Sequence, residues 1–288
     1  MRENPLAVDV SRPADALGEV WSIAWPTVLT MTSYTIMQFV DKLMMGQVSP
    51  LDVAAQGNGG IWAFTPIAVA LGFLTVVNTY VSQNLGAGTP ERAPQYAWAA
   101  LWISVVFWLV VLLPLALVLP AVFERMHDPD QVVELDRLVT LETGYGRILL
   151  CGGIVTLAGR AMHHFFFGLH RPKLITVSAI IGNGTNIVAN YVLIFGERGV
   201  PALGLPGVPG APAWGLYGAA VGTVIGTLVE VMIPAAVFLG PRMNARLRSR
   251  AAWRPAMGPI RDLLRLGWPG ALQFGNEKIG RASCRERV

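Results

Sequence analysis

The sequence predicts an all-α membrane protein whose chain crosses the bilayer several times. Of the 288 residues, 53% are hydrophobic and only 14% are charged, and the mean hydropathy is +0.50. These values lie outside the range of ordinary soluble domains. The apolar residues also gather into blocks of about 20, the length that an α-helix needs to cross the hydrocarbon layer. Alternating apolar segments of about ten residues, which would predict a transmembrane β-barrel, are absent from the sequence.

The same composition excludes several classes of protein. The sequence contains two cysteines, Cys151 and Cys284, so a disulfide-bonded secreted scaffold is excluded. The hydropathy excludes a Rossmann or barrel enzyme. The basic pI of about 9.3 alone would suggest a nucleic-acid binder. The hydropathy argues against that class, so we expect no nucleic-acid partner. The sequence has no nucleophile elbow, phosphate loop or ligand-spaced set of Cys and His residues. We therefore expect the lipid bilayer to be its main environment and do not expect an enzyme.

The first three spans follow from apolar blocks with polar ends. The first is expected at Glu19–Met45, after a charged segment at 1–18 that lacks the apolar core and cleavage site of a signal peptide. The second is expected at Ile61–Leu85 and the third at Tyr96–Phe123. The acidic stretch Glu124–Glu142 is expected to connect the third span to the fourth.

The next three spans complete one unit. They are expected at Arg147–Gly168, Lys173–Gly196 and Leu216–Leu239, and the Pro/Gly-rich segment Gly196–Pro212 precedes the last of them. Residues 19–239 would thus form a six-helix lobe and residues 240–262 a basic linker. A seventh span would begin near Leu263 and continue to Glu277 as the start of a second lobe.

The orientation follows from the basic residues in the connections, because Lys and Arg resist translocation across the membrane. With the N-terminus inside, the Arg-rich linker 240–262 and most other basic residues of the connections face the cytoplasm. The smaller set that falls outside is Lys42, Arg125, Arg137, Arg147 and Arg198. We therefore predict a cytoplasmic N-terminus for a multi-pass protein of the plasma (inner) membrane.

The ends of the chain predict an internal repeat and a foreign tail. Trp25-Pro26 near the start of the first span is echoed by Trp268-Pro269 near the start of the seventh, as in transporters built from parallel repeats. After Glu277 the sequence becomes highly charged, which a membrane helix does not tolerate. We interpret residues 278–288 as a non-native read-through tail to be left out of fold reasoning.

Polar groups inside the spans are the candidate functional residues, because hydrocarbon makes them costly. Asp41 lies about 8 Å from the outer end of the first helix. Asn186 and Asn190 share one face of the fifth helix, and Ala219 and Thr223 share one face of the sixth. A carboxylate, two amides, a hydroxyl and a backbone carbonyl would suit a monovalent cation such as Na⁺, or a proton on the carboxyl group. The alternative is an interfacial Asp41 with asparagines that bond across helices.

Other polar residues in the spans suggest structural roles. Arg160 on the fourth helix and Glu230 on the sixth fall at similar depths and would form a buried ion pair. His163 and His164 approach the inner interface, where they would face headgroups or water. Pro26 would bend the first helix or mark its start.

Several motifs together resemble the multidrug and toxic compound extrusion (MATE) transporters. Their order and their positions between the spans are those expected of the family, and the similarity covers Glu19–Glu277. The motifs lie at residues 25–26, 39–46, 81–88, 168–172, 186–191 and 218–223. The resemblance implies a twelve-helix antiporter of two six-helix lobes, monomeric when full length. It would export drugs and other small amphiphilic or cationic substrates in exchange for H⁺ or Na⁺, with no organic cofactor.

The resemblance also assigns residues. It implies that Asp41, Asn186, Asn190, Ala219 and Thr223 bind the cation in the first lobe, with Asp41, Asn186, Asn190 and Thr223 as ligands if the ion is Na⁺. Glu277 would serve ion or substrate coupling in the second lobe. Asn190 stands where some branches of the family carry Asp, which leaves H⁺ or Na⁺ open.

Two other functions stay open at this point. One is a flippase of the related lipid-linked oligosaccharide superfamily, which would be expected to have a strongly cationic cavity; Arg160 alone is clearly within the membrane in the sequence, which disfavours it. The other is a structural or receptor-like membrane protein that transports nothing. Dye accumulation in cells that express the complete gene would distinguish the latter from a transporter.

Overall fold

The computed structural model describes residues 13–127, 134–200 and 204–285 and is helical over most of these ranges. Within these ranges, the side chains of residues 13–17, 19, 20, 22, 23 and 274–285 lie outside the description. The helices, in chain order, are α1 Pro13–Gly46, α2 Pro50–Gly86, α3 Ala93–Phe107, α4 Leu113–Met126, α5 Leu135–Gly168, α6 Pro172–Phe195, α7 Leu216–Leu239, α8 Pro241–Leu247 and α9 Met257–Arg285. This architecture confirms the all-α fold class.

Within the described ranges, five helical segments are long and apolar enough to cross a membrane: α2, Pro90–Met126, α5, Pro172–Arg198 and α7. The long helix α1 is not among them. Its apolar residues are interrupted by hydroxyl-bearing and other polar side chains between Thr27 and Lys42. Because hydrocarbon makes such groups costly, a helix with this composition is expected to turn its polar side toward other helices. The contacts of α1 described below agree with that expectation.

Two helices begin well before the predicted starts. Helix α2 starts at Pro50 and not at Ile61, because Ser49 caps it by accepting a 3.1 Å hydrogen bond from the Asp52 N–H, and proline is favoured at the first helical position. Helix α5 starts at Leu135 and not at Arg147. The predicted acidic connection Glu124–Glu142 is therefore wrong at its C-terminal end.

The third predicted span is divided by one wide turn. Helices α3 and α4 are joined through a π-helical segment, Trp108–Leu112. Pro114 lacks an N–H, and its ring would collide with the carbonyl four residues earlier in a regular helix. A wider turn just before the proline relieves that collision and keeps the chain helical.

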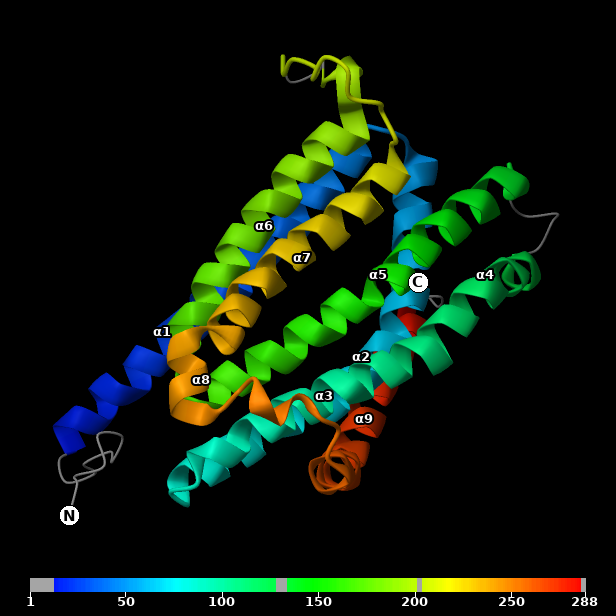
Figure 1. Cartoon of the computed structure of the whole chain (residues 1–288). Coiled ribbons are helices and arrows are strands. Elements are labelled where there is room, and N and C mark those ends of the chain that lie inside the picture. Colours follow the sequence, from blue (N-terminus) through cyan, green and yellow to red (C-terminus); the bar gives the residue numbers. More distant parts are fainter. Residues whose placement is uncertain (1–12, 128–133, 201–203, 286–288) are drawn as a thin grey trace.

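The helices form two groups that share α5. In Figure 1, α1, α6 and α7 run side by side, and their contacts join α1 to α6, α6 to α7 and α7 to α5. On the other side, α5 packs against α2, α3 and α4 around the larger apolar core. A smaller apolar cluster, which includes Met45, Tyr145 and Leu216, lies where α1 and α6 end and α7 begins.

The linker and the seventh span differ slightly from expectation. The segment predicted as the linker 240–262 holds the short helix α8, and α9 begins at Met257 rather than near Leu263. Helix α9 packs closely on α2, where a Cβ at Gly72 would lie 2.3 Å from the backbone of Ala271. The backbone of α9 continues to Arg285, and the interpretation of 278–288 as a foreign tail stays a prediction.

Candidate cation-binding site

The five residues predicted to bind a cation lie in one hydrogen-bonded chain. Asn190 Nδ2 donates to Asp41 Oδ1 over 2.7 Å and to Asn186 Oδ1 over 3.3 Å. Asn186 Nδ2 lies 3.4 Å from Thr223 Oγ1, and that hydroxyl donates over 2.9 Å to the Ala219 carbonyl. The chain joins the C-terminal parts of α1 and α6 to the first turns of α7. We call these five residues the Asp41 cluster.

The Asp41 cluster is withdrawn from the surface of the lobe. Asn186 and Ala219 are each 2% exposed and Asn190 is fully buried, whereas Asp41 and Thr223 are partly buried. The smaller apolar cluster surrounds this end of the bundle. Electrostatic interactions are stronger in such a setting than in water, so a carboxylate here would bind a cation more strongly than a surface carboxylate.

Glycines on α7 allow the amides to reach their positions. A Cβ at Gly222 would lie 2.0 Å from Asn190 Oδ1, and a Cβ at Gly226 would lie 2.5 Å from Asn186 Cβ. Gly218, one turn earlier, lies against the Leu193 carbonyl. Small residues repeated every four positions let membrane helices approach closely. This role was not predicted from the sequence, although the spacing of the three glycines would have indicated it.

One polar atom of the cluster lacks a partner. Asn190 Oδ1 is buried and accepts no hydrogen bond, because the amide nitrogen of the same side chain faces both Asp41 and Asn186. A buried acceptor without a donor is costly. A proton on Asp41 or a bound cation would favour the reverse orientation of the amide, with its oxygen toward Asp41.

The donor set is that of a hard cation. Carboxylate, amide, hydroxyl and carbonyl oxygens are ligands of hard cations, whereas transition metals prefer imidazole and thiolate. Among the side chains that the structure describes, no group of three or more His, Cys, Asp or Glu residues is placed to hold a metal ion. Such a set of oxygen ligands suits a proton or Na⁺ at one carboxylate better than a transition metal.

Helices α1 and α6 share two more polar contacts below the cluster. Asn183 Nδ2 donates to Ser33 Oγ over 2.8 Å, and the hydroxyls of Thr30 and Thr176 lie 3.0 Å apart. Both hydroxyls also lie within hydrogen-bond distance of the Pro26 carbonyl. Pro26 lies inside the continuous helix α1 and contacts α6 at this level. A role of Pro26 in bending α1 stays a prediction.

The structure gives Glu230 a different close partner from the one predicted. His163 Nε2 lies 3.1 Å from Glu230 Oε1, and the Tyr34 hydroxyl donates to the same oxygen. Arg160 instead lies over the Tyr34 ring, with its guanidinium carbon 5.2 Å from the ring centroid. The expectation that His163 faces headgroups or water is wrong, because His163 is 4% exposed. Arg160 is thus a neighbour of the pair rather than its cationic half.

Glu142 is a second buried carboxylate, which the sequence predicted to lie in the connection between the third and fourth spans. Glu142 is fully buried in α5, where its two oxygens accept from Asn58 Nδ2 and contact His127 Nε2, each over 2.8 Å. We call Glu142, Asn58 and His127 the Glu142 cluster. Arg147 also lies within α5, where its Nε donates to the Ala116 carbonyl over 2.8 Å, and its place in the predicted outside set stays a prediction.

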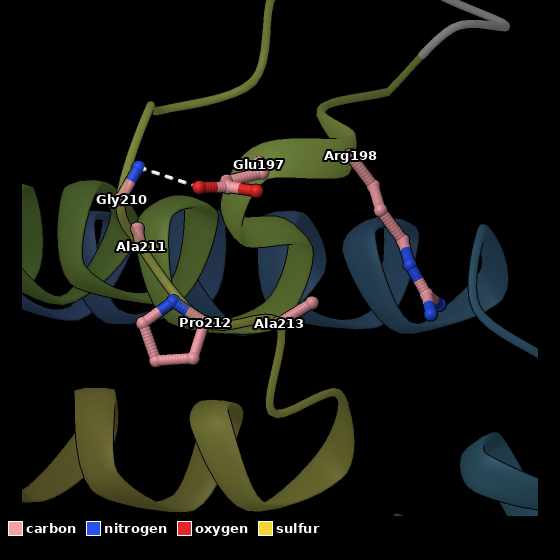
Figure 2. Close-up of a pocket in the computed structure, with 6 residues that line it drawn as sticks. All are labelled: Glu197, Arg198, Gly210, Ala211, Pro212 and Ala213. Carbon is pink, nitrogen blue, oxygen red and sulfur yellow. Dashed lines mark hydrogen bonds between the residues drawn. The ribbon is translucent and has the colours of Figure 1, made fainter.

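A surface pocket lies elsewhere, in the connection between α6 and α7. Its lining residues are Glu197, Arg198, Gly210, Ala211, Pro212 and Ala213. Figure 2 shows that the Glu197 carboxylate turns toward Gly210, whose N–H donates to it over 2.7 Å, while the Arg198 side chain points away. None of the predicted site residues lines this pocket. The predicted residue Glu277 lies in α9, with its side chain outside the described residues.

Comparison with known families gives one match that covers more than half of the chain. The family model MatE matches residues 26–192. This range includes Asp41, Asn186 and Asn190 of the Asp41 cluster.

The curated relatives are bacterial multidrug resistance proteins. The NorM protein of Burkholderia vietnamiensis is 27% identical over 258 residues, which cover 88% of this chain and 51% of the relative. The MdtK protein of Klebsiella pneumoniae subsp. pneumoniae is 31% identical over 239 residues, which cover 80% of this chain and 50% of the relative. The chain thus spans about half the length of the curated relatives it matches.

Solved structures show the same fold. The crystal structure of a MATE protein in complex with MaL6 superimposes with a TM-score of 0.74 and 21% sequence identity, over 89% of this chain and 52% of that one. The helices described above therefore match the N-terminal half of that architecture.

Proposed function

This chain belongs to the MATE family of membrane transporters, and on that premise we propose that it forms the cation-coupling lobe of a drug antiporter. The observation that carries the proposal is the Asp41 cluster, with its single carboxylate, its chain of amide and hydroxyl groups and the unpartnered oxygen of Asn190. The family consists of transporters and not enzymes, which agrees with the expected class.

The proposed mechanism uses the charge of Asp41. In the structure the Asp41 carboxyl accepts the amide N–H of Asn190 over 2.7 Å, a contact that the ionised form would favour. A proton or Na⁺ at the carboxylate would neutralise it and turn the amide oxygen of Asn190 toward Asp41. This change alters the contact between α1 and α6, which is the differential interaction that a cation needs in order to shift a conformational equilibrium.

Export would follow from alternating access. Cation entry from outside would favour the α1 conformation that releases substrate, with Pro26 as the point where α1 bends. The relatives' names specify multidrug resistance, and we extend drug-like, cationic or amphiphilic substrates to the full-length protein. We further propose a monomer in the plasma membrane with a cytoplasmic N-terminus, and a coupling role for Glu277 in the second lobe.

The test uses the full-length gene that encodes this chain, reconstituted in liposomes with a fluorescent cationic dye. Asp41→Asn keeps the size of the side chain and removes the charge, so we expect gradient-driven dye transport to fall to the level of empty liposomes. Glu142→Gln is the matched control, since it removes another buried carboxylate of the lobe. Dye transport that persists in Asp41→Asn would contradict the proposal.

Two gradients separate the coupling ions. An imposed proton gradient and an imposed Na⁺ gradient are applied to the same liposomes, each without the other. Transport driven by one gradient alone identifies the ion. Transport of lipid-linked oligosaccharide without dye movement would instead support the flippase, and no transport of either kind would support a non-transporting protein.

A further inference from the structure

A second group of ionisable side chains lies two helical turns from the Asp41 cluster, in part on the same helices. Tyr34 precedes Asp41 by seven residues on α1, and Glu230 follows Thr223 by seven residues on α7. Seven residues are two helical turns, or about 10 Å along each axis. The Tyr34–Glu230 hydrogen bond therefore forms a layer parallel to the Asp41 cluster, built by two of the same helices.

The environment of Glu230 is closed. The carboxylate side chain is 9% exposed and that of His163 is 5% exposed. On the α6 side, Gly182 packs so closely that a Cβ there would lie 2.6 Å from Glu230 Cβ. The ionisable groups that face Glu230 are Tyr34 from α1 and Arg160, His163 and the adjacent His164 from α5. Helix α6 contributes no ionisable group to this contact.

The 3.1 Å contact between Glu230 Oε1 and His163 Nε2 requires a proton. Carboxylate oxygen and unprotonated imidazole nitrogen are both acceptors, and two acceptors repel each other at this distance. Yet Nε2 has no partner with hydrogen-bond geometry in this buried position. Either the neutral Nε2–H tautomer or an imidazolium supplies that proton, and the adjacent buried carboxylate favours the imidazolium over the neutral ring.

We propose that His163 and Glu230 form a second proton-binding site of this lobe, two helical turns from the Asp41 cluster. A proton taken from water converts the His163 imidazole to imidazolium, and the net charge of the pair changes from −1 to 0. Its release restores the neutral imidazole. Arg160 keeps its own positive charge throughout and lies over Tyr34, where it limits the net negative charge of the empty site.

A role in transport would rest on the proposed function, but proton binding itself does not. If both layers exchange protons, the lobe holds two cation sites along α1 and α7, and occupation of either would change the contacts of both helices. The Asp41 cluster can fail as a coupling site while the His163–Glu230 pair still binds a proton.

The experiment measures the proton directly in this chain, folded in lipid nanodiscs. Histidine labelled with ¹⁵N reports protonation through its ring chemical shifts, and His163→Gln identifies the signal of His163. We expect the His163 signal to change reversibly as the pH is varied, as a ring that gains and loses a proton requires. In Glu230→Gln the proton affinity of His163 should fall about tenfold or more, because the nearby negative charge is lost.

Control variants make the outcome specific. Glu142→Gln should leave the His163 titration unchanged, since Glu142 contacts Asn58 and His127 and not His163. Tyr34→Phe removes the donor to Glu230 Oε1 and should raise the proton affinity of His163, and it serves if Glu230→Gln does not fold. A His163 signal that never titrates, or that titrates identically in Glu230→Gln or in Tyr34→Phe, would overturn the proposal.

Discussion

The Asp41 cluster and the Glu142 cluster both hold a carboxylate near the same end of the bundle, yet their hydrogen bonds differ. Both oxygens of Glu142 have a partner, and the side chain is completely buried. Asp41 is partly buried, and its partner Asn190 keeps an unsatisfied oxygen. The Glu142 cluster joins α2, α4 and α5 across the larger core, whereas the Asp41 cluster joins α1, α6 and α7.

The difference separates a structural carboxylate from one suited to exchange. A buried carboxylate with all partners in place holds its helices together and gains little from an added cation. A carboxylate whose neighbours remain incompletely satisfied can change partners when a cation binds. Burial alone therefore does not identify the coupling residue, and the variants below test the distinction.

Glu142→Ala should have the largest effect on stability. It leaves the Asn58 amide and the His127 ring without their acceptor, so we expect the free energy of unfolding to fall by about 3 kcal/mol. The measurement is unfolding in mixed micelles as the fraction of denaturing detergent increases. Glu134→Ala is the control, since Glu134 forms an exposed pair with Arg137 and should change stability by less than about 0.5 kcal/mol. Equal effects of the two variants would show that the Glu142 cluster is not structural.

Gly222→Ala should disturb the Asp41 cluster without removing any of its polar groups. The added Cβ would lie 2.0 Å from Asn190 Oδ1, so the amide or helix α7 must move, at a cost of about 2 kcal/mol. In the full-length protein, dye transport should fall with it. Gly184→Ala is the control on α6, where a Cβ meets nothing within 4 Å, and it should be neutral or slightly stabilising. Unchanged transport in Gly222→Ala would show that the placement of Asn190 does not matter.

The sequence predicted the members of one cluster and missed the other, for a physical reason. Asn190 and Thr223 lie in apolar helices, where each polar residue stands out and the i, i+4 spacing places partners on one face. Asp41 is the only carboxylate between residues 27 and 46 of α1. Glu142 lies beside Thr143 and Gly144, and such a run resembles a loop when the neighbouring helix is unknown. The structure shows that Gly59 permits the close approach of α2 to Glu142, since a Cβ there would lie 2.9 Å from the Glu142 carbonyl.

Partner choice at Glu230 was also beyond the sequence. Arg160 and His163 lie three residues apart on α5, on nearly the same face, so depth alone cannot decide which of them reaches α7. The rotation of α5 against α1 and α7 decides it, and that rotation depends on packing contacts such as Gly159 against Val231. The sequence could predict most of the helices and the members of the Asp41 cluster, but not these contacts between distant segments.

Ser33→Ala should have the smallest effect on stability. It tests whether the other contacts between α1 and α6 are structural, like the Glu142 cluster, or free to change, like the Asp41 cluster. The Ser33 hydroxyl accepts from Asn183 Nδ2 at 2.8 Å, between the Asp41 cluster and the Thr30–Thr176 contact. Hydrogen bonds between membrane helices contribute about 0.6 kcal/mol on average, so the same unfolding measurement should show a loss of about that size with transport retained. Thr35→Ala is the control, since Thr35 is exposed and lies two residues from Ser33, off the face of α1 that contacts α6. A loss of several kcal/mol would instead show that the α1–α6 contacts are structural, like those of the Glu142 cluster. That result would contradict the proposed movement of α1.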